Sequence, residues 1–195
     1  MTDRAAEGSK QLGWFSNPDP GHLVQFYQST RDLFSPLSEY VRAGVTNDET
    51  CVVIATNEHL QQLENELERQ GVDVSSARIH HVYRPFDAAE TLSKFMVNGM
   101  PNWGRFVNSV GSIVERSSLK QRPIRTYGEM VALLWKQGNK AAVIQLENFW
   151  NELAEWYTFS LYCAYPAFQF ALHASERNEI RVCHNTHLNI LEGAN

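Results

Sequence analysis

The stretch Cys51-Val-Val-Ile-Ala-Thr-Asn57 decides the fold class. Five consecutive apolar residues are typical of a strand that is covered on both faces in a parallel sheet. Thr56 or Asn57 can cap a following helix, because both side chains accept hydrogen bonds from free backbone N–H groups. The leucines at positions 60, 63 and 67 share one helical face, and Gly71 ends the helix. The stretch therefore predicts a strand followed by a helix.

The same alternation continues along the chain on both sides of this unit. Four further strands are predicted at residues 22–27, 78–83, 123–127 and 159–164. Apolar residues at helical spacing predict helices around 33–44, 87–96, 106–114, 129–137 and 139–156. Strands that alternate with helices indicate an α/β domain, with a mainly parallel sheet of about five or more strands joined by right-handed crossovers.

Composition limits the class of protein. The 195 residues are 43% hydrophobic and 20% charged, which suits one globular domain. Seventeen basic and 22 acidic residues give a net charge of -5, which argues against a broad surface for nucleic acid or anionic membrane. No apolar run has the ~20 residues that span a bilayer, and the N-terminus lacks a secretory signal. Three cysteines without a disulfide pattern indicate a cytoplasmic protein.

Breaker residues divide the chain into three parts. Residues 1–20 contain two glycines and two prolines and are expected to form a flexible arm, whose Trp14 and Phe15 can dock on the body. Residues 21–173 form the predicted domain. Residues 174–195 are predicted to be a helical tail.

Polar side chains follow several predicted strands at their carboxyl ends. In open parallel sheets, ligands usually bind at this edge. A carboxylate beside apolar runs also needs a partner, because burying one alone costs several kcal/mol. These two arguments predict a ligand site. Its candidate residues are His22, Tyr27, Arg125, Tyr127, Glu129, Glu147, Trp150 and Tyr165.

Each polar candidate also has a structural interpretation. Glu129 either meets a ligand, pairs with Arg125, or stabilises a helix N-terminus. Glu147 and Asn151, one helical turn apart with Trp150 between them, form either a pocket wall or a polar network that ties their helix to the turn at residues 127–130. A single histidine such as His22 is more often a structural group than a ligand contact.

Catalytic and metal-binding patterns are weak. Asp87 and Glu90 have the spacing of a carboxylate pair, but a helix cap explains the same spacing. Cys163 lies within a predicted strand, so it is a poor nucleophile candidate. We predict no metal site, no cofactor and no enzyme activity. His80 and His81 are predicted to face opposite sides of a strand, so they do not bind one metal together. Cys183, His184 and His187 are close in sequence, but beyond His173 they have no further ligand for a closed metal site.

From residue 22 to about 170, the sequence resembles the MEDS domain, a sensory domain of methanogens, methylotrophs and the dichloromethane repressor. The resemblance rests on His22-Leu-Val-Gln-Phe-Tyr27, Tyr40-Val-Arg-Ala-Gly44 and Asp87-Ala-Ala-Glu90. It rests more heavily on Arg125 with Tyr127-Gly-Glu-Met130. Further matches are Leu134-Trp135, Gly138, Ala142, Leu146-Glu147, Trp150-Asn151 and Cys163-Ala-Tyr-Pro166.

The resemblance implies a sensor of small hydrocarbon derivatives, and a RecA- and KaiC-like three-layer fold related to the circadian-clock ATPases. ATP chemistry needs a phosphate-binding loop with glycines and a lysine. The corresponding turn, Tyr27-Gln-Ser-Thr-Arg-Asp-Leu-Phe34, has neither. The expected fold therefore lacks a functional phosphate loop.

Together these features predict a non-enzymatic cytoplasmic sensor, which binds a small organic molecule and passes the signal to a separate protein, such as a histidine kinase or a transcription regulator, or through self-association. Two alternatives remain open at this stage. One is a ligand-free protein-interaction module, and the other is a degenerate nucleotide-binding protein.

Overall fold

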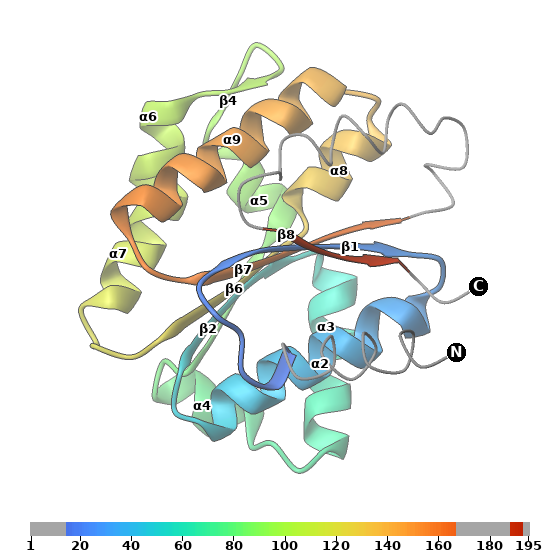
Figure 1. The fold of residues 1–195 in the computed structure, drawn as a ribbon, viewed down its shortest axis with the longest axis vertical. Coiled ribbons are helices and arrows are strands. Elements are labelled where there is room, and N and C mark those ends of the chain that lie inside the picture. Colours follow the sequence, from blue (N-terminus) through green and yellow to red (C-terminus); the bar gives the residue numbers. More distant parts are fainter. Residues whose placement is uncertain (1–14, 167–187, 193–195) are drawn as a thin grey trace.

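The computed structural model describes residues 15–166 and 188–192. Its centre is a six-stranded parallel sheet in the order β3-β2-β6-β7-β1-β8 (Figure 1). The strands are β1 (Gly21–Tyr27), β2 (Thr50–Ala55), β3 (Tyr83–Asp87), β6 (Ile124–Gly128), β7 (Ser160–Pro166) and β8 (Leu188–Glu192). This arrangement confirms the predicted α/β class with a mainly parallel sheet.

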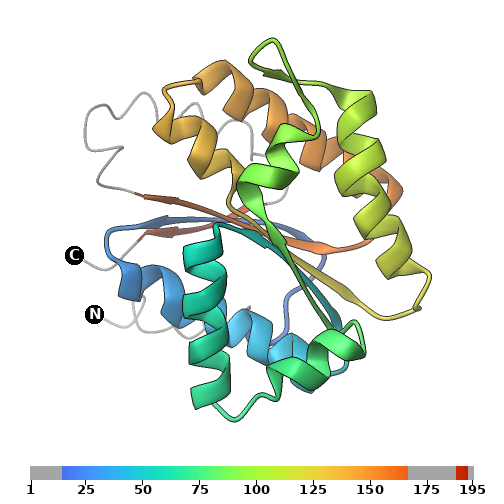
Figure 2. The same ribbon diagram turned by 180° about the vertical axis from the view of Figure 1, so that it is seen from behind.

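Helices cover both faces of the sheet and complete a three-layer sandwich (Figures 1 and 2). One face carries α2 (Thr30–Thr46), α3 (Asn57–Arg69) and α4 (Val74–Ile79). The other carries α5 (Ala88–Ser93), α6 (Trp103–Phe106), the π-helical turn η1 (Val107–Gly111), α7 (Ser112–Ser118), α8 (Met130–Lys136) and α9 (Lys140–Trp156). A small antiparallel hairpin of β4 (Met96–Val97) and β5 (Met100–Pro101) precedes α6.

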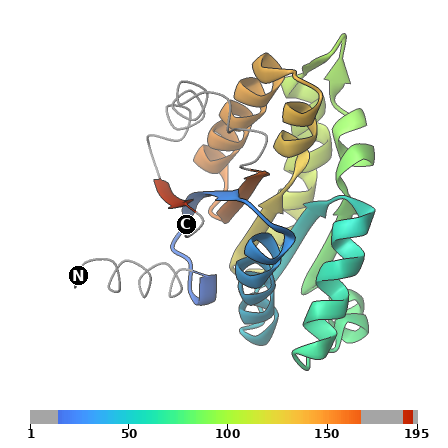
Figure 3. The ribbon, with the colours of Figure 1, turned by 90° about the vertical axis from the view of Figure 1, so that its right-hand side faces the viewer.

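Alternation along the strands gives each face its own core. In β7, Tyr162 and Ala164 pack under α2 and α3, whereas Leu161, Cys163 and Tyr165 pack under α8 and α9. The side view in Figure 3 shows the sheet between the two helical layers. Two residues that are neighbours in a strand therefore belong to different cores.

Residues 78–83 are not the strand that the sequence predicted. Asp73 accepts a hydrogen bond from the Ser76 N–H at 2.8 Å and begins α4, so Ile79 ends a short helix. The strand starts at Tyr83 and contains Pro85. Proline is tolerated there because β3 lies at the edge of the sheet, where one side of the backbone needs no partner.

This shift also corrects the interpretation of the paired histidines. His80 follows the last residue of α4, and His81 has φ of 57°, so neither lies in a strand. Asp87 does cap α5, since its Oδ1 accepts the Glu90 N–H at 2.6 Å. The helix-cap interpretation of Asp87 and Glu90 is thus confirmed.

The predicted helical tail is wrong at residues 188–192, which form β8 and pair in parallel with β1. The other residues of that tail, with Cys183, His184, His187 and His173, lie outside the described part of the chain, as does Trp14. Phe15 docks as predicted, because it is buried and its ring centroid lies 5.5 Å from that of Tyr162. Among the helices of the described residues, none combines the length and apolar character needed to cross a bilayer.

Candidate functional site

The eight predicted site residues do not form one site. Tyr27, Tyr127 and Glu129 lie together at the carboxyl edge of the sheet, on the side of α2 and α3. His22, Glu147, Trp150 and Tyr165 lie on the opposite face, among side chains of α9, β1 and β7. Arg125 is separate from both groups. The division follows from strand alternation, which places His22 and Tyr27 on opposite faces of β1.

The first group, which we call the edge cluster, consists of Tyr27, Tyr127, Glu129 and His59. Glu129 directly follows β6, and its backbone N–H donates to the Ile54 carbonyl at 2.9 Å. Its Oε2 accepts the N–H of Thr56 at 2.9 Å, and its Oε1 lies 2.5 Å from His59 Nδ1. The carboxylate therefore stabilises the start of α3, not the start of α8, and it does not pair with Arg125.

The Glu129 carboxylate affects the pKa of two tyrosine hydroxyls in the edge cluster. Burial raises the pKa of Tyr27 to about 12, and the charge of Glu129 adds to that rise. Burial and the same carboxylate raise the pKa of Tyr127 well above its ordinary value. The Tyr127 hydroxyl is fully buried and has no hydrogen-bond partner among the described residues. Both groups are thus neutral donors at physiological pH, held near a carboxylate.

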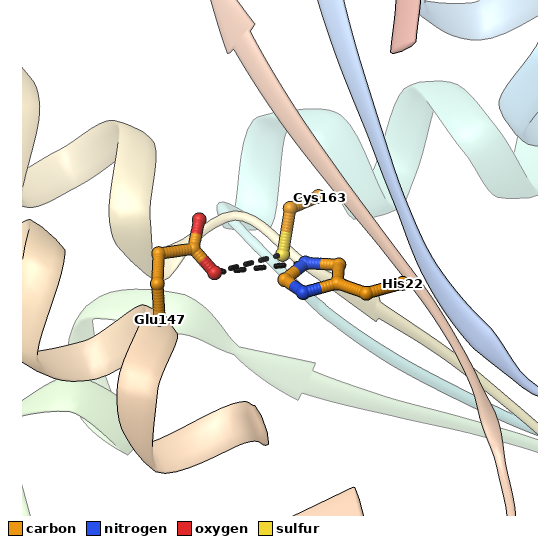
Figure 4. A group of neighbouring side chains, drawn as sticks. All are labelled: His22, Glu147 and Cys163. Carbon is orange, nitrogen blue, oxygen red and sulfur yellow. Dashed lines mark hydrogen bonds and ion pairs between the residues drawn. The ribbon is translucent and has the colours of Figure 1, made fainter. Parts of the chain in front are cut away.

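The second group, the buried cluster, consists of His22, Glu147, Asn151, Cys163 and Tyr165. His22 Nε2 lies 3.6 Å from Glu147 Oε2, and Cys163 Sγ lies 3.9 Å from the same oxygen (Figure 4). The Tyr165 hydroxyl donates to Glu147 Oε1, and His22 Nδ1 lies 3.4 Å from Asn151 Oδ1. Glu147 and Asn151 therefore tie α9 to β1 and β7, not to the turn at residues 127–130 as predicted.

The chain was compared with known protein families. The family model described as "MEDS: MEthanogen/methylotroph, DcmR Sensory domain" matches residues 21–187. The chain belongs to the MEDS family. The match confirms the resemblance found in the sequence and gives the chain a sensory domain. No curated protein matched the chain significantly.

Arg125 has a structural position in this MEDS domain. Its Nε and Nη2 donate to the two oxygens of Glu49, and its Nη1 donates to the carbonyls of Phe15 at 2.7 Å and Tyr40 at 3.0 Å. Nη2 also donates to the Ser16 carbonyl at 3.0 Å. All five N–H groups of the guanidinium are used within the chain, so none remains to bind a ligand.

Sequence reasoning missed two members of these clusters, His59 and Cys163. Thr56 Oγ1 caps the His59 N–H at 3.3 Å, so the position of His59 in the first turn of α3 was available from the strand–helix signal. The sequence predicts Cys163 only as a strand residue and a poor nucleophile, and burial together with the Glu147 carboxylate raises the pKa of its thiol well above the usual value. The neighbours of Cys163 on β1 and α9 are distant from it in the sequence, so no local sequence pattern could predict these contacts.

A surface groove lies outside both clusters. It has a volume of about 910 Å³ and runs between α2 and α3. Phe34 connects it to the edge cluster, because the Phe34 ring lies 5.3 Å from the His59 ring, edge to face. No predicted site residue lines the groove, so the groove is separate from the predicted site.

The His59–Glu129 pair predicts a pH-dependent stability. The hydrogen bond from His59 to Glu129 raises the histidine pKa more than burial lowers it. A raised folded-state pKa stabilises the fold fully below the unfolded value of about 6.5, and this contribution is lost as pH rises through the folded value. The difference in unfolding free energy between wild type and His59→Gln should therefore be largest below about pH 6. Urea titrations across pH measure it, and identical pH curves for the two proteins would contradict the pairing.

Proposed function

We propose that this MEDS domain is a non-enzymatic sensor that binds a small polar organic molecule at the edge cluster and passes the signal to a separate protein. The observation that carries the proposal is the Tyr127 hydroxyl. It is buried and has no hydrogen-bond partner among the described residues, and the charge of Glu129 contributes to its raised pKa. An unsatisfied buried hydroxyl costs ~1–3 kcal/mol, and a ligand oxygen would remove that cost.

The chemistry of the edge cluster favours a ligand with both a donor and an acceptor. Tyr27 and Tyr127 offer hydroxyl donors, and Glu129 offers a carboxylate that accepts. The Tyr127 ring lies 5.3 Å from the Tyr162 ring, so the surroundings of the Tyr127 hydroxyl are partly aromatic. Apolar walls with a few convergent polar groups are typical of small-molecule sites. Signalling then requires that the ligand bind two conformations of the domain unequally.

The start of α2 favours this function over nucleotide binding. Ser29 accepts the Asp32 N–H at 3.2 Å, and Asp32 accepts the Ser29 N–H at 3.0 Å, which completes a capping box. A phosphate would need these N–H groups and would meet the Asp32 carboxylate. The free, buried thiols of Cys51 and Cys163 support a cytoplasmic setting.

Replacement of Tyr127 by phenylalanine tests the proposal. Without ligand, Tyr127→Phe should raise the unfolding free energy by about 1 kcal/mol, because an unpaired buried hydroxyl is removed. With ligand, it should weaken binding by ~10-fold or more, which is the effect of losing about 1.4 kcal/mol. Native mass spectrometry of the purified chain identifies a co-purified ligand, and a panel of short alcohols, aldehydes and carboxylic acids in thermal-shift assays identifies others.

Tyr40→Phe is the matched control. The Tyr40 hydroxyl is buried on the same face, but it donates to the Ser160 carbonyl at 3.1 Å and contacts the Ser160 hydroxyl at 2.8 Å. This variant should lose stability and keep ligand affinity. If Tyr127→Phe behaves like Tyr40→Phe in both assays, the edge cluster is structural. A loss of partner binding on deletion of residues 1–14, with no ligand found, would favour the interaction module instead.

A further inference from the structure

Three side chains with metal-binding atoms converge on the face of the sheet opposite to the edge cluster. His22 comes from β1, Cys163 from the adjacent β7, and Glu147 from α9 above them (Figure 4). Their ligand atoms, Nε2, Sγ and a carboxylate oxygen, all lie within 4.8 Å of one another. His22 is 5% exposed, Glu147 1% and Cys163 0%. Within the described residues, this is the group of three with such geometry.

The distance between His22 and Glu147 suits shared coordination better than a direct hydrogen bond. His22 Nε2 lies 3.6 Å from Glu147 Oε2, beyond the ~2.7–3.2 Å of an N–H···O hydrogen bond. Tetrahedral zinc holds its nitrogen, oxygen and sulfur ligands at about 2.0–2.3 Å, so that these ligands lie about 3.4–3.6 Å from one another. The separations of 3.6 Å and 3.9 Å from Glu147 Oε2 come within a few tenths of an ångström of those values.

Two outer side chains orient the ligands. The Tyr165 hydroxyl donates to Glu147 Oε1, which leaves Oε2 facing the histidine and the thiol. Asn151 Oδ1 lies 3.4 Å from His22 Nδ1, on the side of the ring away from Glu147. Metal-binding histidines usually give their second ring nitrogen to a carbonyl or carboxylate, and ligating carboxylates are themselves hydrogen-bonded. The buried cluster contains both kinds of support.

One tautomer of His22 is suited to a shared cation. If Nδ1–H faces the Asn151 oxygen, Nε2 of the neutral ring is an acceptor. It then points at a carboxylate oxygen, which is an acceptor too. Two acceptors in a buried site repel each other unless a positive charge lies between them. That charge is either a second proton on the ring or a metal ion, and the nearby Cys163 sulfur favours the metal.

We propose that His22, Glu147 and Cys163 bind one divalent transition-metal ion. The donor set of one thiolate, one imidazole and one carboxylate is best matched to Zn²⁺. Binding would displace the thiol proton of Cys163 and fix β1, β7 and α9 to one another. This site is distinct from the edge cluster, and it does not depend on the function proposed there.

The Trp150 indole and the Cys163 thiol both lie next to Gly128. A Cβ atom built on Gly128 would lie 3.8 Å from Cys163 Sγ and 3.8 Å from Trp150 Nε1, so both atoms border the space over this glycine. The Trp150 indole N–H is buried and has no hydrogen-bond acceptor among the described residues. Zinc sites with three protein ligands take water as the fourth ligand, and water would complete the coordination here.

Cobalt titration of the chelator-stripped full chain tests the proposal. Co²⁺ is the probe, because a thiolate–cobalt bond gives a near-ultraviolet charge-transfer band and a tetrahedral site gives visible d–d bands. Wild type should bind one Co²⁺ per chain with both features, and added Zn²⁺ should remove them. Cys163→Ser should abolish the charge-transfer band. His22→Gln and Glu147→Gln should each weaken binding at least 10-fold, the lower end for supporting side chains.

Cys51→Ala is the matched control, since Cys51 is also a free, buried thiol but lies in the core under α2 and α3. It should leave both bands unchanged. Circular dichroism checks that every variant is folded. If Cys163→Ser is unfolded, the loss of Co²⁺ binding in His22→Gln or Glu147→Gln tests the site instead. Folded wild type that binds no Co²⁺ would overturn the proposal and leave a proton between His22 and Glu147. A charge-transfer band that survives in Cys163→Ser would overturn it as well.

Discussion

Arg125→Met is expected to lower the free energy of unfolding by about 3–5 kcal/mol, the usual cost of removing one partner of a buried ion pair. Arg125 is 1% exposed, and its guanidinium is bonded to Glu49 and to three backbone carbonyls. The substitution leaves the Glu49 carboxylate and these carbonyls without their donor. Burial alone lowers the pKa of Arg125, but the hydrogen bond and charge of Glu49 reverse that effect, so the arginine stays charged.

Arg122→Met is the control for this prediction. Arg122 Nε also pairs with an acid, Asp48, at 3.1 Å, but 30% of the Arg122 side chain and 68% of the Asp48 side chain are exposed. Exposed ion pairs contribute ~0–1 kcal/mol, so this variant should unfold almost like wild type. Urea denaturation monitored by tryptophan fluorescence measures both. Equal small effects would show that Arg125 is available to a ligand after all.

Gly44→Ala is expected to cost about 2–3 kcal/mol, although alanine is the better helix former. A Cβ atom at Gly44 would lie 2.4 Å from Cys51 Sγ and 2.7 Å from Arg125 Cδ. Neither neighbour moves easily. Cys51 lies in a central strand, and Arg125 is held by Glu49 and the carbonyls. The added methyl group must therefore displace α2 from the sheet or break the ion pair.

Gly104→Ala supplies the matched glycine-to-alanine change. Gly104 lies in α6, and the nearest atom to a new Cβ would be Asn102 Oδ1 at 3.7 Å. This variant should gain ~0.5–1 kcal/mol from lost backbone freedom in the unfolded chain. Thermal unfolding of both variants should thus shift in opposite directions. A gain in stability for Gly44→Ala would contradict the close packing of α2 on β2 and β6.

The sequence predicted most of the fold because local patterns determine most of it. The run of apolar residues at 51–55 is a central strand, buried along its whole length, and a periodic apolar face lies on each of the longer helices. The prediction failed at residues 78–83, where a short capped helix has too few turns to show a period. Ile79, Val82 and Tyr83 are residue types common in strands, and Pro85 is rare within them, so the prediction placed the strand too early.

The candidate site was predicted less well, for a geometric reason. The residues were chosen because they lie near strand ends or beside apolar runs, but such positions do not specify a face of the sheet. Tyr165 and Tyr127 lie on neighbouring strands and still point into different cores. Trp156, the last residue of α9, is 55% exposed although it continues the apolar periodicity of that helix. Contacts such as His22 with Glu147 depend on residues far apart in sequence, which no local pattern contains.

The place of β1 in the sheet has a consequence for how this protein folds. In space, β1 lies between β7 and β8, both of which come from the final part of the chain. During synthesis on the ribosome, β1 can pair with β7 only after residues 160–166 have been made. Pairing between such distant segments is slow, because a long loop must close before any contact compensates for it. The contact of His22 with Cys163 therefore closes one of the long loops of the chain, and we expect it to form late in folding.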